Sequence, residues 1–517
     1  MSNYSQAIGV LDAPPRPGVA KAEVSWFAAI VLPSFGVMVF GVALLEVLFL
    51  SQGAQGLFRD SDTGWHVRNG EAILNTFTAP RADPFSYTRN GTEWFAWEWL
   101  SDVLFGSVHR IAGLSGVALL AGFVIALTAW GAARFSLSLG GNLFFTGAGS
   151  VLLLGTTSIH WLARPHVFSW LLSLLFLAIV EHERRRPSRA IYVLPLLACL
   201  WANLHGSFLL GPAILFIYAA AEWINRRFAA ACLASLLATF INPYGWRLHE
   251  HVFTYLSNSY LMDHIAEFRS FSFHSAGALY VELFLLAAVL GTIALLRQKA
   301  YGPALLAIGL LHISLYSARH LPTAAVLLLP LCVAALTKEA GGWPRLRPML
   351  EYSKRLCAID RKVWGVIPVV LGLTLTVGSI GIAGFDPAVF PVRAADFLEK
   401  HTAGGRIFAK DQWGGYLIYR FSGRTKVFID GRSDFYGQGL LETYGQVMEV
   451  KPGWDAVLKQ YDVRFVLVPS DHALASALQL SSRWKRVYAD SVADVFESVE
   501  QGPDPLLPGR GRARSAG

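Results

Sequence analysis

The chain has 517 residues, of which 54% are hydrophobic and only 15% are charged, whereas a soluble protein carries about 25% charged residues. This balance predicts an integral membrane protein and excludes an ordinary soluble domain. The net charge of +8 does not indicate nucleic acid as a partner, because basic residues cluster in short links between alternate apolar runs.

Eleven apolar runs are predicted to cross the bilayer, whose ~30 Å hydrocarbon core needs about 20 helical residues. They cover residues 26–50, 114–134, 142–160, 167–183, 190–204, 207–225, 228–242, 276–296, 301–317, 321–337 and 363–383. The first run lacks a small-residue cleavage site after a short apolar core, so we expect it to be retained. Residues 26–383 would form the transmembrane domain, preceded by a disordered cytoplasmic leader at 1–25.

Lysine and arginine gather in alternate links between these runs. The clusters are Arg134; Arg184, Arg185, Arg186 and Arg189; Arg226 and Arg227; Arg297 and Lys299; Lys338, Arg345, Arg347, Lys354, Arg355, Arg361 and Lys362. The positive-inside rule places them, and the N-terminus, in the cytoplasm. An odd number of spans in the inner (plasma) membrane then sends residues 384 onward to the extracytoplasmic face.

The first external loop, residues 51–113, contains an amphipathic stretch, GTEWFAWEWLSDVLFGSVHRIAG. Its tryptophans and phenylalanines alternate with acidic residues, which is typical of a helix that lies in the membrane interface against lipid. It is too polar to span.

Residues 384–498 alternate short β-rich runs (RIFAK, GYLIYRF, TKVFID, RFVLVPS and ADVFES) with helical stretches at 392–401 and 454–461. This order predicts a small extracytoplasmic α/β domain, with turns at WGGY and IDGRSDFYG. Residues 499–517 are expected to be a disordered tail. The fold class is therefore an α-helical polytopic membrane protein of about eleven helices with a small C-terminal α/β domain.

Polar residues gather at the external ends of the predicted spans. They are Asp60, Asp62, His66, Glu98, Arg164, His166, Asn203, His205, Asn242, His249, Glu267, Arg319 and His320. Each could be a capping or snorkelling residue on its own. Their position on one face at many points of the chain favours a functional site, because polar groups near hydrocarbon are costly.

The first loop gives the most specific signal, through DTGWHVRNGEAIL, PRADPFSYT and WEWLSDVLF. Together with RPHVFSWLL, WANLHGSF, NPYGWRL, SARHLP, WGGYLIYRF and FIDGRSDFYG, it resembles a bacterial group of GT-C-fold membrane glycosyltransferases. The wider class includes protein O-mannosyltransferases, the lipid A aminoarabinose transferase and oligosaccharyltransferase subunits. The resemblance runs from about residue 27 to 498. It implies transfer of a sugar from a polyprenyl-phosphate donor to a lipid, glycan or protein acceptor on the external face.

The resemblance also implies roles for acidic residues. In the class, a first-loop carboxylate acts as the base or helps to bind a divalent cation, and Asp62 is the match here. Asp60 is the second candidate, although both could instead cap the helix that follows. His66 would share a helix face with Asp62, as a metal ligand or as a structural histidine. Glu98 would be the second acidic group of the site.

A divalent cation, Mg²⁺ or Mn²⁺, is the cofactor that the class implies, with Asp62 and His66 as its candidate ligands. The sequence nevertheless lacks the adjacent Asp-Glu pair of the mannosyltransferases.

The lipid phosphate needs cations at the same face. Arg319 with His320, and Arg164 with His166, are basic pairs at external helix ends. Arginine binds phosphate through two parallel hydrogen bonds, so Arg319 is the first candidate, and snorkelling to the interface is its alternative. His66, His205 and Glu267 complete the predicted substrate-binding set.

Two other functions remain open at this point. A transporter or flippase of lipid-linked glycans should carry polar groups near mid-membrane and on both faces. A non-catalytic assembly protein would use the C-terminal domain to bind a partner.

Overall fold

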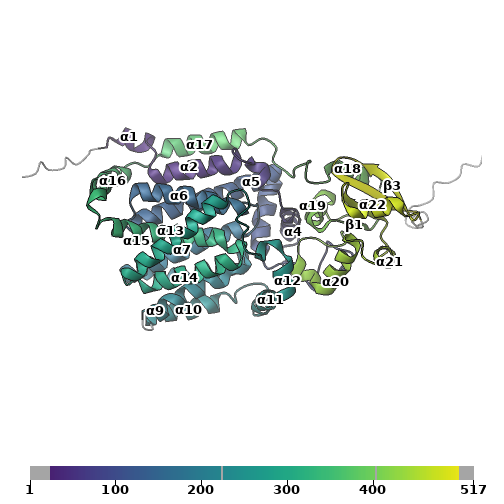
Figure 1. Ribbon diagram of the computed structural model, residues 1–517, viewed down its shortest axis with the longest axis horizontal. Helices are drawn as coiled ribbons and strands as arrows, with labels where there is room; N and C mark the ends of the chain where they lie inside the picture. Colours follow the sequence, from purple (N-terminus) through teal and green to yellow (C-terminus); the bar gives the residue numbers. More distant parts are fainter. Residues whose placement is uncertain (1–23, 223–224, 402–404, 500–517) are drawn as a thin grey trace, which may run out of the picture.

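A helical bundle and a smaller α/β domain lie end to end along the long axis of the molecule (Figure 1). The structure, a computed structural model, describes residues 24–222, 225–401 and 405–499. Most of the predicted leader and most of the predicted tail therefore lie outside the described residues.

Apolar helices build the bundle. Within the described residues, six segments are long and apolar enough to cross a membrane: α1 and α2 (Trp26–Val31 and Phe35–Leu48), α5 (Trp99–Ser138), α6 with η1 (Leu143–Thr157 and Ser158–His160), α7 (His166–Arg185), α13 (Ala278–Arg297), and η5 with α15 (Ala318–His320 and Leu321–Ala340). Four shorter apolar segments are η2 with α8 (Arg189–Val193 and Leu194–Leu204), η3 with α9 (Gly206–Leu209 and Leu210–Ala221), α14 (Tyr301–Tyr316) and α17 (Val366–Ser379). Each predicted span overlaps one of these segments or α10 (Arg226–Ala238).

Shorter polar elements connect the bundle helices. They are α3 (Gly53–Gly56), α4 (Asp62–Thr76), α11 (Arg247–Leu256), α12 (Ser259–His264), η4 (Ala266–Phe268), η6 (Pro344–Leu346) and α16 (Arg347–Asp360). Side-chain caps fix several helix starts: Ser34 accepts the Val37 N–H of α2, and Asn142 accepts the Phe144 N–H of α6. Such caps satisfy backbone donors that have no partner inside the helix.

The long helix α5 is bent at Ala112 and Gly113, whose backbone angles are not helical. Gly113 has φ +58°, a left-handed conformation that glycine adopts without the steric cost of a Cβ atom. The part before the bend is the amphipathic segment predicted from the sequence, and the part after it contains the predicted span 114–134. The bend therefore lets one continuous helix contain both an amphipathic segment and an apolar segment that is predicted to span the membrane.

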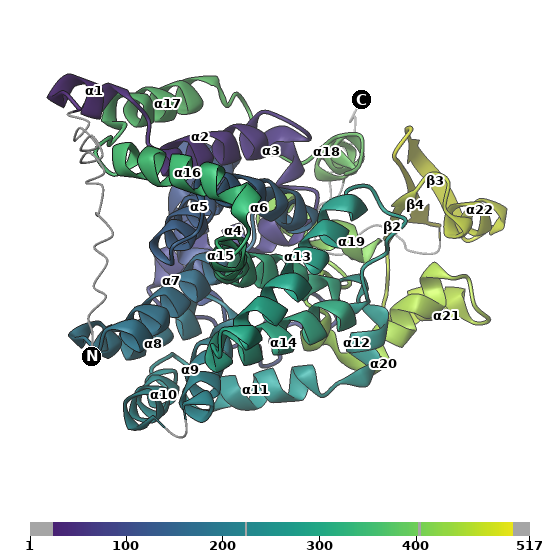
Figure 2. The same cartoon turned by 60° about the vertical axis from the view of Figure 1, so that its left-hand side comes forward.

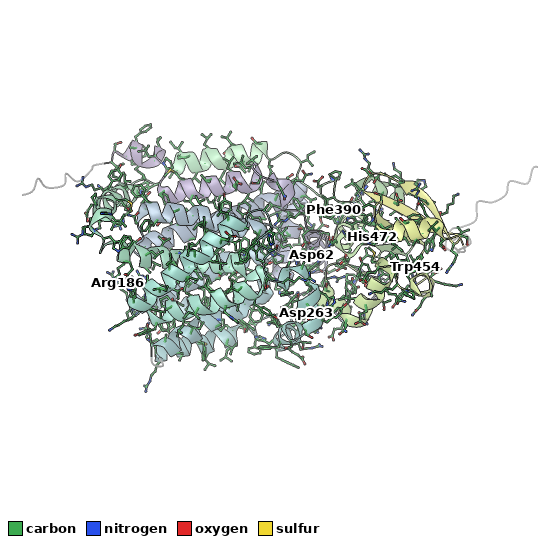
Figure 3. The ribbon with its side chains drawn as sticks, in the orientation of Figure 1. Asp62, Arg186, Asp263, Phe390, Trp454 and His472 are labelled. Atoms are coloured by element: carbon green, nitrogen blue, oxygen red, sulfur yellow. The ribbon has the colours of Figure 1, made fainter. Side chains whose placement is uncertain are left out.

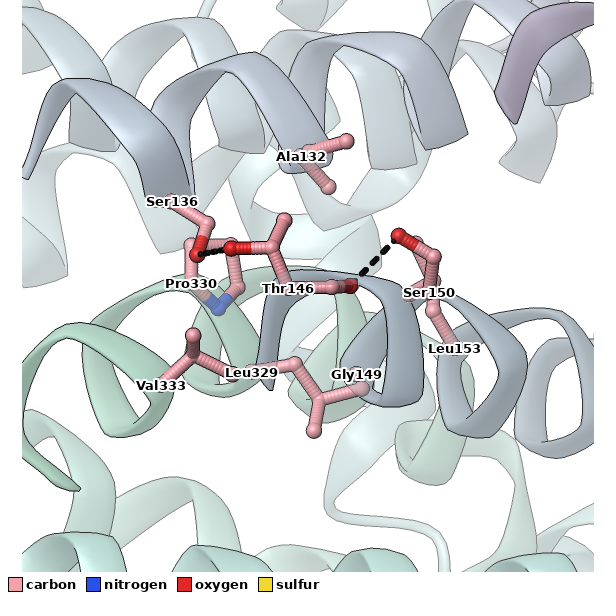
Figure 4. Close-up of a pocket in the computed structure, with 10 residues that line it drawn as sticks. Ala132, Ser136, Thr146, Gly149, Ser150, Leu153, Leu329, Pro330 and Val333 are labelled. Carbon is pink, nitrogen blue, oxygen red and sulfur yellow. Dashed lines mark hydrogen bonds between the residues drawn. The ribbon is translucent and has the colours of Figure 1, made fainter. Parts of the chain in front are cut away.

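The bundle interior is closely packed where α5, α6 and α15 meet around Pro330 (Figure 4). The cavity there measures about 10 Å³, room for no more than one water. The hydroxyls of Ser136 and Thr146 lie 3.1 Å apart, and the Ser150 hydroxyl donates to the Thr146 carbonyl at 2.8 Å. Because these hydroxyls are paired, the cavity is a feature of helix packing.

The two ends of the bundle differ in chemistry. Asp62 lies where the bundle meets the C-terminal domain, whereas Arg186 lies at the opposite end (Figure 3). The basic helix α16 also lies away from the C-terminal domain (Figures 1 and 2). This separation agrees with the alternation of basic links along the sequence.

The C-terminal domain contains a four-stranded sheet in the order β1-β2-β4-β3. Its strands are β1 (Ile407–Ala409), β2 (Phe465–Pro469), β3 (Trp484–Ala489) and β4 (Ala493–Ser498). β1 and β2 are parallel, and the β2–β4 and β3–β4 pairs are antiparallel. Five helices accompany the sheet: α18 (Val392–His401), α19 (Asp411–Phe421), α20 (Ser433–Met448), α21 (Trp454–Gln460) and α22 (Ala473–Leu480).

Part of the strand prediction in this domain is wrong. GYLIYRF and WGGY belong to helix α19 and form neither a strand nor a turn. The aromatic and β-branched composition favoured a strand, but the buried residues Trp413, Leu417 and Phe421 follow helical spacing. In TKVFID, Val427 makes isolated bridges to Ile407 and Ser86, and strand β3 was not predicted.

Helix α19 docks the C-terminal domain onto α4 through glycines. A Cβ atom on Gly64 would collide with the Gly415 carbonyl, and one on Gly415 with the Ser61 carbonyl. The two backbones can therefore approach only because neither position carries a side chain. This close contact fixes the domain over the start of α4, where Asp62 lies.

Candidate active site

A polar cavity of about 60 Å³ lies between the end of the bundle and the C-terminal domain. The residues that line it are Asp62, Trp65, Trp94, Trp97, Glu98, His160, Arg164, Pro165, His166, His205, Tyr255, Arg319, Gly431, Arg432 and Asp434. Six of the residues singled out from the sequence are among them. Segments more than 300 residues apart in the sequence, from Asp62 to Asp434, thus converge on one space.

Asp62 is the first residue of α4 and is buried at 5% exposure. Asp60 accepts the Asp62 backbone N–H at 2.8 Å, so Asp60 takes the capping role and leaves the Asp62 carboxylate free to face the cavity. Burial raises the pKa of Asp62 to about 7, with a further rise from Asp60 and an opposing contribution from Arg164. A carboxyl group with this pKa can exchange a proton near neutral pH.

Arg164 stands at the centre of three carboxylates. It extends from the link between η1 and α7 and lies 2.9 Å from Asp60 Oδ2, 2.9 Å from Asp62 Oδ2 and 3.2 Å from Glu267 Oε1. Burial would raise the pKa of Glu267, but the guanidinium groups of Arg164 and Arg319 together hold it below its usual range. The cluster therefore gathers three carboxyl groups around one guanidinium.

Arg319 contacts the same network from η5. Its Nη1 lies 3.6 Å from Glu267 Oε2, and its guanidinium lies 5.2 Å from the centre of the Phe268 ring. The Arg319 side chain is 26% exposed, against 18% for Arg164. Arg319 thus forms one long ion pair with a carboxylate, whereas Arg164 forms three shorter ones.

Glu98 faces two histidines on the other side of the cavity. Its carboxylate lies 3.3 Å from His205 Nε2 and 3.7 Å from His66 Nε2. The Ser207 backbone N–H donates to His205 Nδ1, so a neutral His205 carries its proton on Nε2, toward Glu98. Burial raises the pKa of Glu98 to about 7 and, with nearby cations led by Arg319, holds the pKa of His205 well below its usual range.

His66 is fully buried on α4 and held by Asp102. Its Nδ1 lies 2.5 Å from Asp102 Oδ1, and Asp102 Oδ2 accepts a hydrogen bond from the Asn69 side chain at 2.6 Å. Burial lowers the pKa of His66 to about 3, so its ring is neutral. His66 Nε2 has no hydrogen-bond partner among the described residues and faces Glu98.

The C-terminal domain contributes Arg432 to the cavity. Arg432 binds Asp430 through two nitrogens at 2.8 and 2.6 Å and reaches Asp83 of the first loop at 2.9 Å. Its guanidinium lies 4.5 Å from the centre of the Trp94 ring. Because Asp83 and Trp94 belong to the first loop, this buried cation joins the two parts of the molecule at the cavity that Asp62 also lines.

Several site residues were not predicted as such. His160, Tyr255, Arg432 and Asp434 line the cavity, and Asp102 donates its backbone N–H to the carbonyl of Glu98, which does. Asp102 lies one helical turn after Glu98, and this spacing could have predicted that the two acidic side chains lie on the same face of the helix. The others are brought in by tertiary packing. Four of the predicted catalytic and binding residues are not among the described residues that line the cavity: Asp60, His66, Glu267 and His320.

The residues at this site do not fit the divalent cation that the sequence resemblance implies. Within the described ranges, no group of three or more His, Cys, Asp or Glu side chains has an arrangement suited to a metal ion. The two predicted ligands have separate partners, since Asp62 pairs with Arg164 and His66 with Asp102. A cation bound to Asp62 would lie against the positive charge of Arg164.

Comparison with known proteins defines the fold. No protein-family model matches the sequence, and neither does any curated protein. The oligosaccharyltransferase of Archaeoglobus fulgidus in the apo form matches with a TM-score of 0.58 at 11% identity, over 86% of this chain and 70% of that chain. The archaeal oligosaccharyltransferase AglB with an inhibitory peptide and a dolichol-phosphate gives 0.57 at 11% identity, over 93% and 75%.

A third structure, of the Archaeoglobus fulgidus enzyme with zinc and sulfate, gives a TM-score of 0.55 at 10% identity, over 90% of this chain and 73% of that chain. The chain therefore has the GT-C fold of membrane glycosyltransferases. At this level of identity the likeness defines the fold, and the chemistry has to be argued from the site.

Proposed function

We propose that this protein is a membrane glycosyltransferase that moves a sugar from a polyprenyl-phosphate donor to an acceptor on the extracytoplasmic face. One observation carries the proposal. On a GT-C fold, a buried carboxyl group with a pKa of about 7, Asp62, faces a polar cavity at the end of the bundle. The site is assembled at one end of the helices, whereas a transporter would need polar groups along a path through the membrane.

Asp62 acts as the general base. It takes the proton of the acceptor nucleophile as that atom attacks the anomeric carbon of the donor sugar. The bond between that carbon and the phosphate oxygen breaks, and the electron pair leaves with the polyprenyl phosphate. Burial places the pKa of Asp62 near neutrality, the range in which a carboxylate both accepts and releases a proton efficiently.

Arg319 binds the phosphate of the donor. Its guanidinium lines the cavity and is held by one ion pair of 3.6 Å to Glu267. Its remaining N–H groups can pair with phosphate oxygens and stabilise the charge that grows on the leaving group. Arg164 is the next candidate, although three carboxylates already surround it.

The C-terminal domain covers and shapes the site. Gly431, Arg432 and Asp434 line the cavity, and a Cβ atom at position 431 would collide with the Asp62 carboxylate.

The orientation puts the N-terminus and the basic links in the cytoplasm and the C-terminal domain outside. Arg186 lies at the end of the bundle away from that domain, as the positive-inside rule requires of a cytoplasmic link. A cysteine placed at Ser433 should react with a membrane-impermeant thiol reagent in intact cells, and the native Cys357 should not. The reverse labelling pattern would move the site to the other face of the membrane.

The proposed activity is tested in cells by mass spectrometry of lipid-linked and surface glycans. A strain without the gene should accumulate a polyprenyl-phosphate sugar and lose a glycosylated surface lipid, glycan or protein. The wild-type gene should restore both, and a gene carrying Asp62→Asn should restore neither. Unchanged glycan pools in the deletion strain would reject the proposal.

A further inference from the structure

The three carboxylates around Arg164 come from two separate parts of the chain. Asp60 precedes α4, Asp62 begins that helix, and Glu267 lies in η4, about 200 residues further along. Their oxygens approach the same guanidinium at 2.9, 2.9 and 3.2 Å. Such a convergence of acidic groups near hydrocarbon requires a compensating positive charge.

Convergent carboxylate oxygens are also the ligands that Mg²⁺ and Mn²⁺ prefer, at about 2.0–2.2 Å. At this site the positive charge is supplied by the protein itself. Arginine stays ionised in any environment that a protein offers, and the Arg164 side chain is only 18% exposed. A divalent ion would have to displace this guanidinium or share the carboxylates with it against charge repulsion.

We infer that Arg164 is the resident cation of this site, takes the part of a divalent ion among Asp60, Asp62 and Glu267, and keeps such an ion out. Removing the guanidinium therefore leaves three carboxylates that bind a divalent cation. The consequence for catalysis, that transfer proceeds without added metal and survives chelators, rests on the proposed function. The prediction that the three carboxylates bind a divalent cation once the guanidinium is removed does not rest on the proposed function.

Geometry favours this exchange. Arg164 Nη1 contacts Asp60 and Glu267, and Nη2 contacts Asp62. A cation near the position of Nη1 would need the Asp60 and Glu267 oxygens, now at 2.9 and 3.2 Å, to move inward by about 1 Å, and the Asp62 oxygen, which contacts Nη2, to move further. Arg319 offers a matched contrast, because Glu267, at 3.6 Å, is the only carboxylate among the described residues with which it forms an ion pair.

The test measures binding of Mn²⁺ alone to the purified full-length protein in detergent at pH 8, by electron paramagnetic resonance of free Mn²⁺. The wild type should show no saturable site, and Arg164→Ala should gain one with a Kd of ~10⁻⁴–10⁻³ M, the weak end of oxygen-ligand sites. Arg164→Lys, which keeps a positive charge, and Arg319→Ala should gain none. Adding Asp62→Asn to Arg164→Ala should abolish the new site.

Thermal unfolding of each variant checks that it is folded, and Arg164→Gln replaces Arg164→Ala if the alanine variant is not. Saturable Mn²⁺ binding by the wild type that is lost in Asp62→Asn would overturn the inference. So would a folded Arg164→Ala or Arg164→Gln variant that gains no site. Either outcome leaves the proposed transfer reaction untouched, because no sugar donor is involved.

Discussion

The two sides of the cavity balance a buried carboxyl group in different ways. On one side, Asp62 lies 2.9 Å from the guanidinium of Arg164, whose charge does not change with pH. On the other side, Glu98 lies 3.3 Å from the imidazole of His205 and 3.7 Å from that of His66, and both rings are neutral. Burial raises the pKa of each carboxyl group to about 7.

This difference separates two roles. A carboxyl group beside a permanent cation keeps a defined position in both protonation states, as a base that shuttles a proton must. A carboxyl group between neutral imidazoles gains and loses hydrogen bonds as its own proton moves. We therefore assign the base to the arginine side, and a positioning role near the substrate to Glu98.

The largest effect is expected at Asp62. Asparagine keeps the size of the side chain but cannot accept a proton, so Asp62→Asn should reduce transfer by at least ~10², the lower scale for losing a general base. The thermal unfolding temperature should not fall, since Asp60 supplies the cap. Asp60→Asn is the matched control and should retain most activity. A fully active Asp62→Asn variant would move the base to Asp60 or Glu98.

A smaller effect is expected at Arg319. Arg319→Ala should weaken donor use by ~10- to 10²-fold, the scale of a hydrogen bond to a charged group. Arg319→Lys should restore it only in part, because a point charge replaces a bidentate fork. Donor titrations of the transfer rate measure both effects. Unchanged donor dependence in the two variants would assign the phosphate to Arg164.

Much of the bundle could be predicted because membrane spans depend on local composition. Apolar length places α2, α7 and α15, and the alternation of basic links orders the two ends. The bend at Gly113 also follows from the change from amphipathic to apolar sequence. The helix α19 could not be predicted in this way, because docking of its two glycines against α4 outweighs the strand-like composition of GYLIYRF.

The candidate site was predictable only as a set of side chains at one face. Arg164 could be named because it is a polar residue at the end of a predicted span, whereas Asp62 was selected through the resemblance of the first loop and Glu98 as an acidic residue of the amphipathic stretch. Their partners could not, since pairing depends on contacts between distant segments, such as Asp62 with Arg164, or Arg432 with Trp94. Sequence reasoning therefore proposed Asp62 and His66 as joint metal ligands, whereas packing gives them separate partners.

The pH dependence of transfer distinguishes the two sides of the cavity. The wild-type rate should rise with pH and level off above about 7, the pKa of Asp62. Because Asp60 raises that pKa, Asp60→Asn should move the rise to lower pH. Glu98→Gln should leave it in place. A rise that moves with Glu98→Gln but not with Asp60→Asn would place the base on the histidine side.

The smallest expected effect concerns stability. Folding raises the pKa of Asp62 from its usual value near 4 to about 7, so the unfolded chain binds fewer protons between these pH values. The contribution of Asp62 to stability therefore falls as pH rises from about 4 to 7. Asp62→Asn should flatten this part of the unfolding temperature curve by a few degrees, measured against Asp60→Asn. If Asp62 instead made the wild-type protein more stable as pH rises from about 4 to 7, folding would lower the pKa of Asp62, opposite to the assigned shift.

The most direct test of the proposed transfer uses membranes from a strain that lacks the gene, because these contain the accumulated donor and the acceptor together. Purified wild-type protein is added, and mass spectrometry follows the sugar-loaded polyprenyl phosphate. We predict conversion to free polyprenyl phosphate with equal gain of sugar on an acceptor, at a rate at least ~10² lower with Asp62→Asn. Folded wild-type protein that leaves the loaded carrier unchanged would contradict the account.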